Sequence, residues 1–306
     1  MKRNNDITID FVIPWVDGND PEWIKSFQKY NTNDEKTDTS NIRYRDHGLL
    51  RYWFRAVEEF APWVNKVHFI TNGQKPEWLN INNNKLNWVK HDDYIPNELL
   101  PVFSSHPIEL YMHKIPNLSE HFVYFNDDNF INRPVKPEDF FKNGLPLDVG
   151  AINCTYFGKD SAGFFHAADL VVINSHFNKK QVMKRDWKKW YHPKNGYMNV
   201  LKNVLLFPWL WFPGFYNQHV SNNFLKSTFE TVWAEEFEIL DETCRHKFRK
   251  NGDVNQWVMK YWQLADGKFN VRSGDFAFCY HVKPKNFNRL CEDLKNQTHA
   301  LICIND

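Results

Sequence analysis

Short runs of β-branched and aromatic residues recur along the chain, and most of them stop at Asn, Asp or Gly. Val, Ile, Phe and Tyr suit a covered pleated surface, whereas Asn and Asp favour turns. The runs therefore predict buried strands, which cover residues 7–15, 66–71, 86–90, 121–125, 276–282 and 300–304. Three of these strands end near Asp17, Asn72 and Asp127, so parallel pairing would deliver polar groups to one edge of one sheet.

Between the strands, apolar residues recur at the three- and four-residue spacing of helices with one buried face. The clearest case covers residues 49–60 and ends before Ala61-Pro62, because a residue preceding proline resists the α conformation. Another helix is predicted at 254–265, with Asp253 as its N-cap and Gly267 just past its end. Further helices are predicted at 107–115, 167–173, 182–190, 222–234 and 287–294. This order predicts an α/β, Rossmann-like fold with a mainly parallel sheet, flanking helices and a helical insertion in the second half.

The composition shows that the chain can bury a large hydrophobic core and that its net charge is close to zero. It has 306 residues, 42% of them hydrophobic, and a formal net charge of +1, which gives no argument for a nucleic-acid partner. The most apolar run, residues 205–216, is too short to span a bilayer and is broken by Pro208 and Pro213. We expect a hydrophobic core loop there, with a lip facing lipid or acceptor as the alternative. Basic pairs within residues 179–189 indicate a solvated helix face or a contact with an anionic surface.

The cysteines and the N-terminus bear on the compartment. The five cysteines are widely spaced and follow no metal-binding pattern, so they are expected to be reduced thiols. The first ten residues lack the apolar segment of a secretory signal. These features predict a cytoplasmic protein with, at most, a peripheral association with the inner face of a membrane.

The candidate chemistry is concentrated where the strand at 121–125 ends in Asp127 and Asp128. Two carboxylates at the carboxyl end of a strand could hold a divalent cation against the phosphates of a substrate. The alternative is an Asp-rich turn without a ligand, because Asn and Asp favour turns through their own hydrogen bonds. Asp10 is a further candidate, since an acid inside a strand is out of place unless it is paired or functional.

Four separated blocks carry a family resemblance. They are IDFVIPWVDGNDPEW at 9–23; RYRDHGLLRYWFRAVEEFAPWVNKVHFITNGQKPEWLN at 43–80, continued by VYFNDDNF; His219 with TCRHKFRKNGDVNQWVMKYWQLADGKF at 243–269; and LICIND at 301–306. In these blocks the chain resembles the Stealth family of sugar-1-phosphate transferases, which includes bacterial capsular and exopolysaccharide phosphotransferases and the catalytic part of the eukaryotic GlcNAc-1-phosphotransferase. The blocks occur in the family's order and cover most of the chain.

The resemblance implies one catalytic domain over residues 1–306 with a GT-A-like fold. Residues 1–150 would form the nucleotide-sugar-binding half, and residues 151–306 the helical insertion and the remaining active-site blocks. The chain ends within the fourth block, so we expect the natural protein to continue past Asp306. The donor would be a UDP-hexose or UDP-N-acetylhexosamine, and the acceptor a saccharide hydroxyl. The product would be a phosphodiester, with release of UMP, in capsular or exopolysaccharide synthesis.

The resemblance also assigns roles to individual residues. Asp10 and Asp128 match active-site acids of the family, His219 is the expected general base, and Arg249 the expected phosphate contact. His246 is a weaker alternative for the base. Mg²⁺ or Mn²⁺ would be held by Asp127, Asp128 and Asp306. Substrate contacts are expected from Asp17, Gly18, Arg45, Arg51, Asn72, Gly73 and Gln74.

Two other functions are compatible with the same residues. A glycosyltransferase of the GT-A type would also use an acid pair, a metal and a UDP-sugar, but it would release UDP instead of UMP. A carbohydrate-binding protein without activity would need none of the catalytic groups, yet all four candidates are present. The nucleotide product distinguishes the first alternative, and the absence of any product distinguishes the second.

Overall fold

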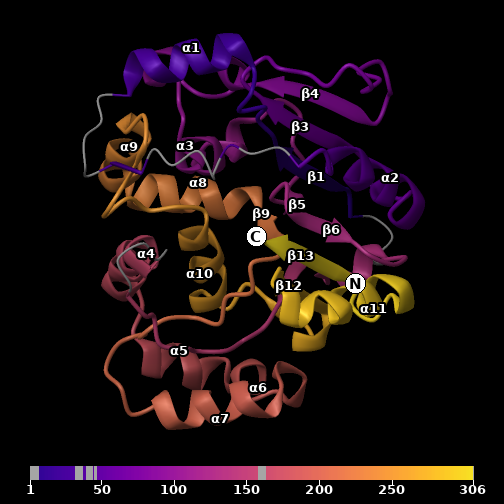
Figure 1. Ribbon diagram of the computed structural model, residues 1–306. Helices are drawn as coiled ribbons and strands as arrows, with labels where there is room; N and C mark the ends of the chain where they lie inside the picture. The colour runs from indigo at the N-terminus through magenta and orange to yellow at the C-terminus, as the bar shows by residue number, and fades with distance from the viewer. Residues whose placement is uncertain (1–6, 32–36, 39–43, 45–46, 158–162, 306) are drawn as a thin grey trace.

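A five-stranded sheet in the order β4-β3-β1-β5-β9 lies at the centre of the computed structural model (Figure 1). The structure describes residues 7–31, 37–38, 44, 47–157 and 163–305. The sheet strands are β1 (Ile9–Pro14), β3 (Val67–Thr71), β4 (Leu86–Lys90), β5 (His121–Tyr124) and β9 (Asn222–Leu225). The first four run parallel and β9 runs antiparallel to β5. The predicted α/β class with a mainly parallel sheet is confirmed.

Two apolar layers cover the sheet because residues alternate between its faces. Phe11 and Ile13 of β1 pack in one core cluster with Trp53 of α2 (Leu50–Phe60), the helix predicted most clearly. Val12 belongs to the second cluster, on the opposite face, together with Phe122 of β5. The sheet is therefore buried on both sides, as parallel sheets generally are.

The edge strand β9 corrects the predicted helix at 222–234. Its side chains are buried, and the amide of Gln263 accepts a hydrogen bond from Leu225 N and donates one to Asn223 O. Asn223 in turn donates to the carbonyls of Phe140 and Leu147. Pairing with β5 and these distant partners outweigh the local helical spacing. The helix, α8, begins only at Lys226 and runs to Glu235.

The remaining helices and strands agree with the sequence in part. The helices are α1 (Pro21–Tyr30), α3 (Ser105–Leu110), α4 (Gly163–His176), α5 (Lys179–Arg185), α6 (Trp187–Trp190), α7 (Tyr197–Leu206), α9 (Phe237–Arg245), α10 (Trp257–Ala265) and α11 (Phe287–Asn296). The sequence missed α1, α7 and α9. A three-stranded sheet, β12-β13-β6, is formed by β12 (Ala277–His281), β13 (Leu301–Asn305) and β6 (Asn129–Ile131). The described residues also form short strands: β2 (Thr37–Asp38), β7 (Phe141–Lys142), β8 (Leu145–Asp148), β10 (Arg249–Lys250) and β11 (Asn270–Val271).

Two further predictions in the second half are wrong. Asp253 is not the N-cap of α10, which begins at Trp257; its carboxylate instead accepts from Lys250 N at 2.8 Å and contacts His246 Nδ1 at 2.7 Å. The apolar run at 205–216 is not a buried loop throughout. Trp209, Leu210 and Trp211 are all more than half exposed. Among the described residues, no helix is both long and apolar enough to cross a membrane.

Candidate functional site

The turn after β5 lies at the carboxyl end of the parallel strands, as predicted. Asn126, Asp127 and Asp128 form this turn, and β6 follows at once. β13 pairs antiparallel with β6, and the backbone N–H of Ile304 donates to the Asp128 carbonyl at 2.9 Å. The last strand of the chain therefore delivers its side chains to this turn.

The Asp128 carboxylate is the centre of the site. Its Oδ2 atom lies 3.2 Å from His219 Nε2 and accepts hydrogen bonds from Cys303 Sγ at 3.2 Å and Asn305 Nδ2 at 3.3 Å. Its Oδ1 atom accepts from Asn129 Nδ2 at 2.7 Å. The Asp128 side chain is 20% exposed and that of His219 is 43% exposed. An acid held by several donors thus faces an imidazole that solvent and substrate can reach.

Each member of the Asp128–His219 pair stabilises the charge of the other. Burial favours the neutral forms of both, but their hydrogen bond and mutual charge outweigh burial. The pKa of Asp128 is therefore held below its ordinary value, and the pKa of His219 is raised above its ordinary value. The arrangement resembles an acid that orients and polarises a catalytic histidine.

A chain of contacts links His219 to Arg249. Asn126 Nδ2 lies 3.3 Å from His219 Nε2, and the Asn126 amide oxygen lies 2.7 Å from the Tyr124 hydroxyl. That hydroxyl also lies 2.9 Å from Glu109 Oε1. Burial raises the pKa of Glu109, although the positive charge of Arg249 opposes the rise. The structure therefore brings His219 and Arg249 toward one buried acid, Glu109.

Arg249 is fixed by a side-chain contact and by strand pairing. Its Nη2 atom donates to Ser105 Oγ of α3 at 2.8 Å, and its backbone pairs with Asp38 in the small sheet of β10 and β2. A guanidinium carries five N–H donors in a planar fork, a geometry that matches the oxygens of a phosphate. His246, the alternative base, is instead held by Asp253.

Asp10 is not brought to this site. It is the second residue of β1 and lies at the amino ends of the strands, whereas Asp128 follows their carboxyl ends. Its fully buried carboxylate is surrounded by four groups: Asn65 Nδ2 at 2.8 Å, Lys66 N at 3.2 Å, Ser119 N at 2.7 Å and His68 Nε2 at 3.1 Å. Burial alone would raise the pKa of Asp10, but these hydrogen bonds lower it. The geometry corrects the expectation that Asp10 faces the pocket with Asp128.

The predicted substrate loops after β1 and β3 lie side by side, and some of their polar groups form hydrogen bonds between the two loops. The Gln74 amide accepts from Asp17 N at 2.9 Å and donates to Asp17 O at 3.0 Å. Gly18 is packed against the backbone of Tyr44, where an added Cβ would lie 2.2 Å from the Tyr44 carbonyl oxygen. This packing leaves no room for a side chain at position 18, which accounts for the glycine; its predicted contact with substrate stays a prediction.

Other predicted contacts remain exposed at the same edge. Asn72 and Gly73 are exposed in the turn after β3, and Gly73 has a φ of +107° that favours glycine. The Arg51 guanidinium lies 5.8 Å from the ring centroid of Trp78. Both line a hollow of about 100 Å³ with Trp15, Gly48, Leu50 and Pro76. Arg45 lies outside the described residues.

Comparison with known proteins decides the family. One family model, Stealth protein CR1, conserved region 1, matches residues 8–35, and a second, Stealth protein CR2, conserved region 2, matches residues 43–147. The capsular polysaccharide phosphotransferase WcwK of Streptococcus pneumoniae is 41% identical over 97% of this chain and 89% of its own length. The chain belongs to the Stealth family.

Two other relatives of this Stealth chain match it with similar identity and over a similar share of its length. The receptor polysaccharide phosphotransferase WefC of Streptococcus oralis is 40% identical over 97% of this chain and 90% of its own. The exopolysaccharide phosphotransferase cps2G of Lactiplantibacillus plantarum is 39% identical over 100% of this chain and 89% of its own. These matches confirm the resemblance seen in the sequence.

Among solved structures, the galactosyltransferase LgtC in complex with donor and acceptor sugar analogs has a TM-score of 0.40. It is 9% identical over 96% of this chain and 86% of that chain. At this distance the likeness assigns no ligand and no residue role to the Stealth chain.

The groups that could share a metal ion differ from the predicted set. Among the described residues, ligand atoms of Asp128, His219 and Cys303 all lie within 4.8 Å of one another. Asp127 is exposed beside them, and Asp306 lies outside the described residues. A set of one carboxylate, one imidazole and one thiol suits a softer ion than Mg²⁺. Oxygen ligands for Mg²⁺ would come from the two acids of the turn and from the Asn305 amide.

Several residues of the Stealth site escaped the sequence analysis. They are Glu109, Ser105, Tyr124, Asn126, Asn129, Cys303 and Asn305. One signal was available for Glu109, an acid inside the apolar stretch PIELYM, because buried acids are rare unless paired. Cys303 and Asn305 alternate on the last strand, but nothing local indicates that this strand pairs with β6.

Proposed function

We propose that this Stealth chain transfers a hexose-1-phosphate or N-acetylhexosamine-1-phosphate from a UDP-sugar to a saccharide hydroxyl. The proposal rests on one observation: Asp128, His219 and Arg249 converge on the carboxyl edge of the sheet in a chain 41% identical to a capsular polysaccharide phosphotransferase. The reaction class comes from the names of the relatives. The three side chains provide the acid, the base and the phosphate-binding cation that such a reaction requires.

The reaction is a displacement at the β-phosphorus of the donor. The acceptor oxygen forms a bond to that phosphorus, and the bond from the phosphorus to the bridging oxygen of the pyrophosphate breaks. UMP leaves with the bridging oxygen, and the sugar phosphate becomes a phosphodiester of the acceptor. The acceptor proton must be removed, and negative charge on the phosphate oxygens must be stabilised.

His219 would remove the proton. Its Nε2 atom is held by Asp128 at 3.2 Å, so Nδ1 is the nitrogen that would take the acceptor proton. The charge of Asp128 stabilises the imidazolium that forms, which also explains the raised pKa of His219. A base with a pKa somewhat above the ordinary value matches proton removal near neutral pH.

Arg249 would bind the phosphate that is transferred. The guanidinium is anchored through Ser105 at 2.8 Å, and its positive charge lies close enough to Glu109 to oppose the rise in the pKa of that acid. The loops that carry Asp17, Asn72 and Gly73 would border the nucleotide, because they leave the same edge of the sheet. Arg51, on the rim of the small hollow, would contact a donor phosphate.

A divalent cation, Mg²⁺ or Mn²⁺, fits the acidic turn. Asp127 and Asp128 offer carboxylates, the adjacent Asn305 offers an amide, and the buried Asn129 Oδ1 atom has no hydrogen-bond partner among the described residues. When bound, the cation would neutralise charge on the pyrophosphate and on the departing UMP. Asp306 would extend this ligand set.

The proposal is tested by incubating the protein with a panel of UDP-hexoses and UDP-N-acetylhexosamines and a short oligosaccharide acceptor. Mass spectrometry should find the acceptor enlarged by one sugar and one phosphate with one of these donors. Asp128→Asn is the matched negative control. An acceptor enlarged by a sugar without phosphate would indicate a glycosyltransferase instead, and an unchanged acceptor with every donor would contradict the proposal.

A further inference from the structure

Helix α7 (Tyr197–Leu206) exposes its apolar face, whereas an ordinary amphipathic helix buries it. Its apolar side chains at positions 197, 198, 201, 204 and 205 occupy about 120° of the helix circumference and are all exposed. Its one buried residue is polar: Asn203 accepts from Ile152 N at 2.7 Å and donates to the carbonyls of Gly150 and Trp190. The helix is therefore anchored by an amide and turns its apolar stripe outward.

The apolar surface continues past the end of α7. We call α7 face the exposed side chains of Tyr197, Met198, Leu201, Val204, Leu205, Trp209, Leu210 and Trp211, which are between 48% and 92% exposed. The turn that carries the two tryptophans is fixed, because the Asn174 amide donates to Phe212 O at 3.1 Å and accepts from Phe212 N at 2.9 Å. This surface is thus preformed and large, and large exposed apolar patches usually mark interaction sites.

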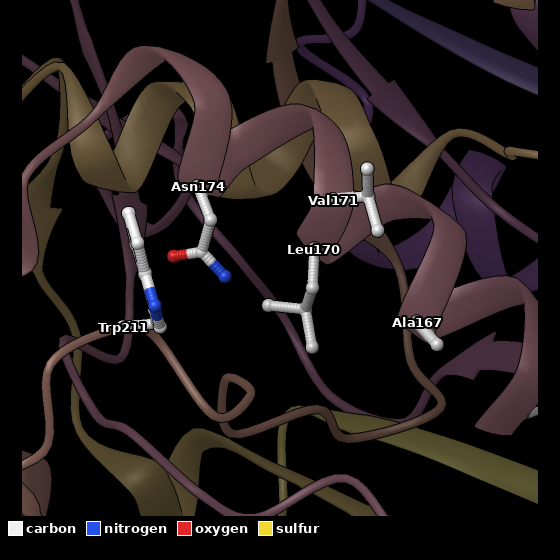
Figure 2. Close-up of a pocket in the computed structure, with 5 residues that line it drawn as sticks. All are labelled: Ala167, Leu170, Val171, Asn174 and Trp211. Atoms are coloured by element: carbon white, nitrogen blue, oxygen red, sulfur yellow. The ribbon is translucent and has the colours of Figure 1, made fainter.

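Next to the α7 face, α4 and Trp211 border a shallow apolar hollow that is largely open to solvent (Figure 2). It has a volume of about 390 Å³ and is lined by Ala167, Leu170, Val171, Asn174 and Trp211. Val171 is itself 68% exposed on the outer side of α4. A hydrocarbon chain could lie here, since four of the five lining side chains are apolar or aromatic.

The same part of the chain concentrates positive charge. Residues 179–211 contain eight Lys or Arg side chains and one acid, Asp186, for a net charge of +7, whereas the whole chain carries +1. Lys184, Lys188 and Lys194 are exposed on α5, on α6 and before α7. Figure 1 shows α5, α6 and α7 together at one end of the molecule, separated from the central sheet.

We propose that the α7 face docks on an anionic phospholipid bilayer, with the tryptophans and aliphatic side chains at the lipid interface and the lysines near the headgroups. Charge decides between the possible occupants. A second copy of this chain would bring the exposed Lys184, Lys188 and Lys194 of one molecule near those of the other, whereas an anionic bilayer complements them. A nucleic acid would match the charge but would leave the apolar stripe without a partner. The inference is independent of the reaction proposed above.

Vesicle co-sedimentation tests this directly. The protein should sediment with vesicles of equal parts phosphatidylglycerol and phosphatidylcholine, and much less with phosphatidylcholine alone. The variant Leu201→Gln, Leu205→Gln, Trp209→Gln should bind the mixed vesicles at least about tenfold more weakly. Replacing the exposed Lys184, Lys188 and Lys194 by Gln should weaken binding and reduce its dependence on salt.

The matched control carries Phe287→Gln and Leu294→Gln on α11, where both side chains are also exposed, and should bind like the wild type. Circular dichroism checks that each variant is folded, and turnover of a soluble acceptor should be unchanged in all of them. Equal binding by the wild type and the α7 variant would overturn the proposal, as would failure of the wild type to bind anionic vesicles. Sedimentation equilibrium adds one more contrary result: a dimer that the α7 substitutions dissociate would identify the face as an interface between copies.

Discussion

The replacement of Asp10 by Asn separates a structural acid from a catalytic one. We predict that Asp10→Asn destabilises the protein by about 3 kcal/mol but leaves the turnover of the folded molecules nearly unchanged. The reason is placement: Asp10 lies at the amino ends of β1 and β3, and the proposed active site follows their carboxyl ends.

The magnitude follows from the groups around the carboxylate. Asn65 Nδ2 and Lys66 N donate to Oδ1, while Ser119 N donates to Oδ2, which also contacts His68 Nε2. Asn87 Nδ2 lies 2.9 Å from His68 Nδ1, which leaves His68 Nε2 to donate to Asp10. An Asn side chain would present an NH₂ group to one of these two pairs of donors. Two buried donors left unsatisfied cost about 2–6 kcal/mol together.

Urea unfolding followed by tryptophan fluorescence measures the stability loss, and initial rates at a temperature where the variant is folded measure turnover. Because the folded pKa of Asp10 is depressed, its stabilisation is present above the unfolded pKa near 3.8 and is lost as the pH falls through the folded value. The stability difference between the wild type and Asp10→Asn should therefore shrink in acid. Asp128→Asn is the matched contrast, with a loss of about 10²–10³ in the kcat of the folded molecules. A folded Asp10→Asn protein with a comparable loss of kcat would refute this reasoning.

Three further predictions concern the site itself. The acid limb of the pH–rate profile should lie above pH 6.5, because the reaction requires neutral His219 and the pKa of His219 is raised. In Asp128→Asn, the acid limb of the residual activity should move to lower pH. An acid limb at the same pH in both proteins would contradict the pairing of Asp128 with His219. Arg249→Lys should lower kcat/KM by at least about tenfold, since the ammonium cannot bind phosphate with two parallel hydrogen bonds, and wild-type kinetics in this variant would exclude the phosphate contact. EDTA should abolish activity, and Mg²⁺ or Mn²⁺ should restore it. Zn²⁺ should inhibit the enzyme by binding Asp128, His219 and Cys303, and the variant Cys303→Ser should be less sensitive to inhibition by Zn²⁺. Full activity in EDTA would contradict the proposed requirement for a divalent cation.

The sequence predicted those parts of the fold that depend on local patterns. β1, β3, β4 and β5 are short runs rich in β-branched and aromatic residues, and α2 carries its apolar stripe between clear boundaries, so each could be read without knowledge of its neighbours. β9 could not, because its strand conformation depends on pairing with β5 and on the amide of Gln263, 38 residues away from Leu225. The outward stripe of α7 was likewise hidden, since it depends on where Asn203 is anchored.

The candidate site shows the same division. Asp128 was found because two acids follow a buried strand, and His219 and Arg249 because of the family resemblance; the structure links all three through side-chain contacts. Glu109 was missed because its importance comes from the Tyr124 hydroxyl and the Arg249 charge, both distant in sequence. Asp10 could have been placed better from the sequence alone, since it stands at the start of its strand and ligands bind near strand carboxyl ends.

The identity of the nucleotide released during transfer distinguishes transfer of a sugar phosphate from transfer of a sugar alone. With a UDP-sugar that is turned over, chromatography of the quenched reaction should show UMP formed in equal amount to the enlarged acceptor, and ³¹P NMR should show a phosphodiester in that acceptor. Asp128→Asn should form neither product above background. Release of UDP in equal amount to an acceptor that lacks phosphorus would contradict the account, because the sugar would then have been transferred without its phosphate.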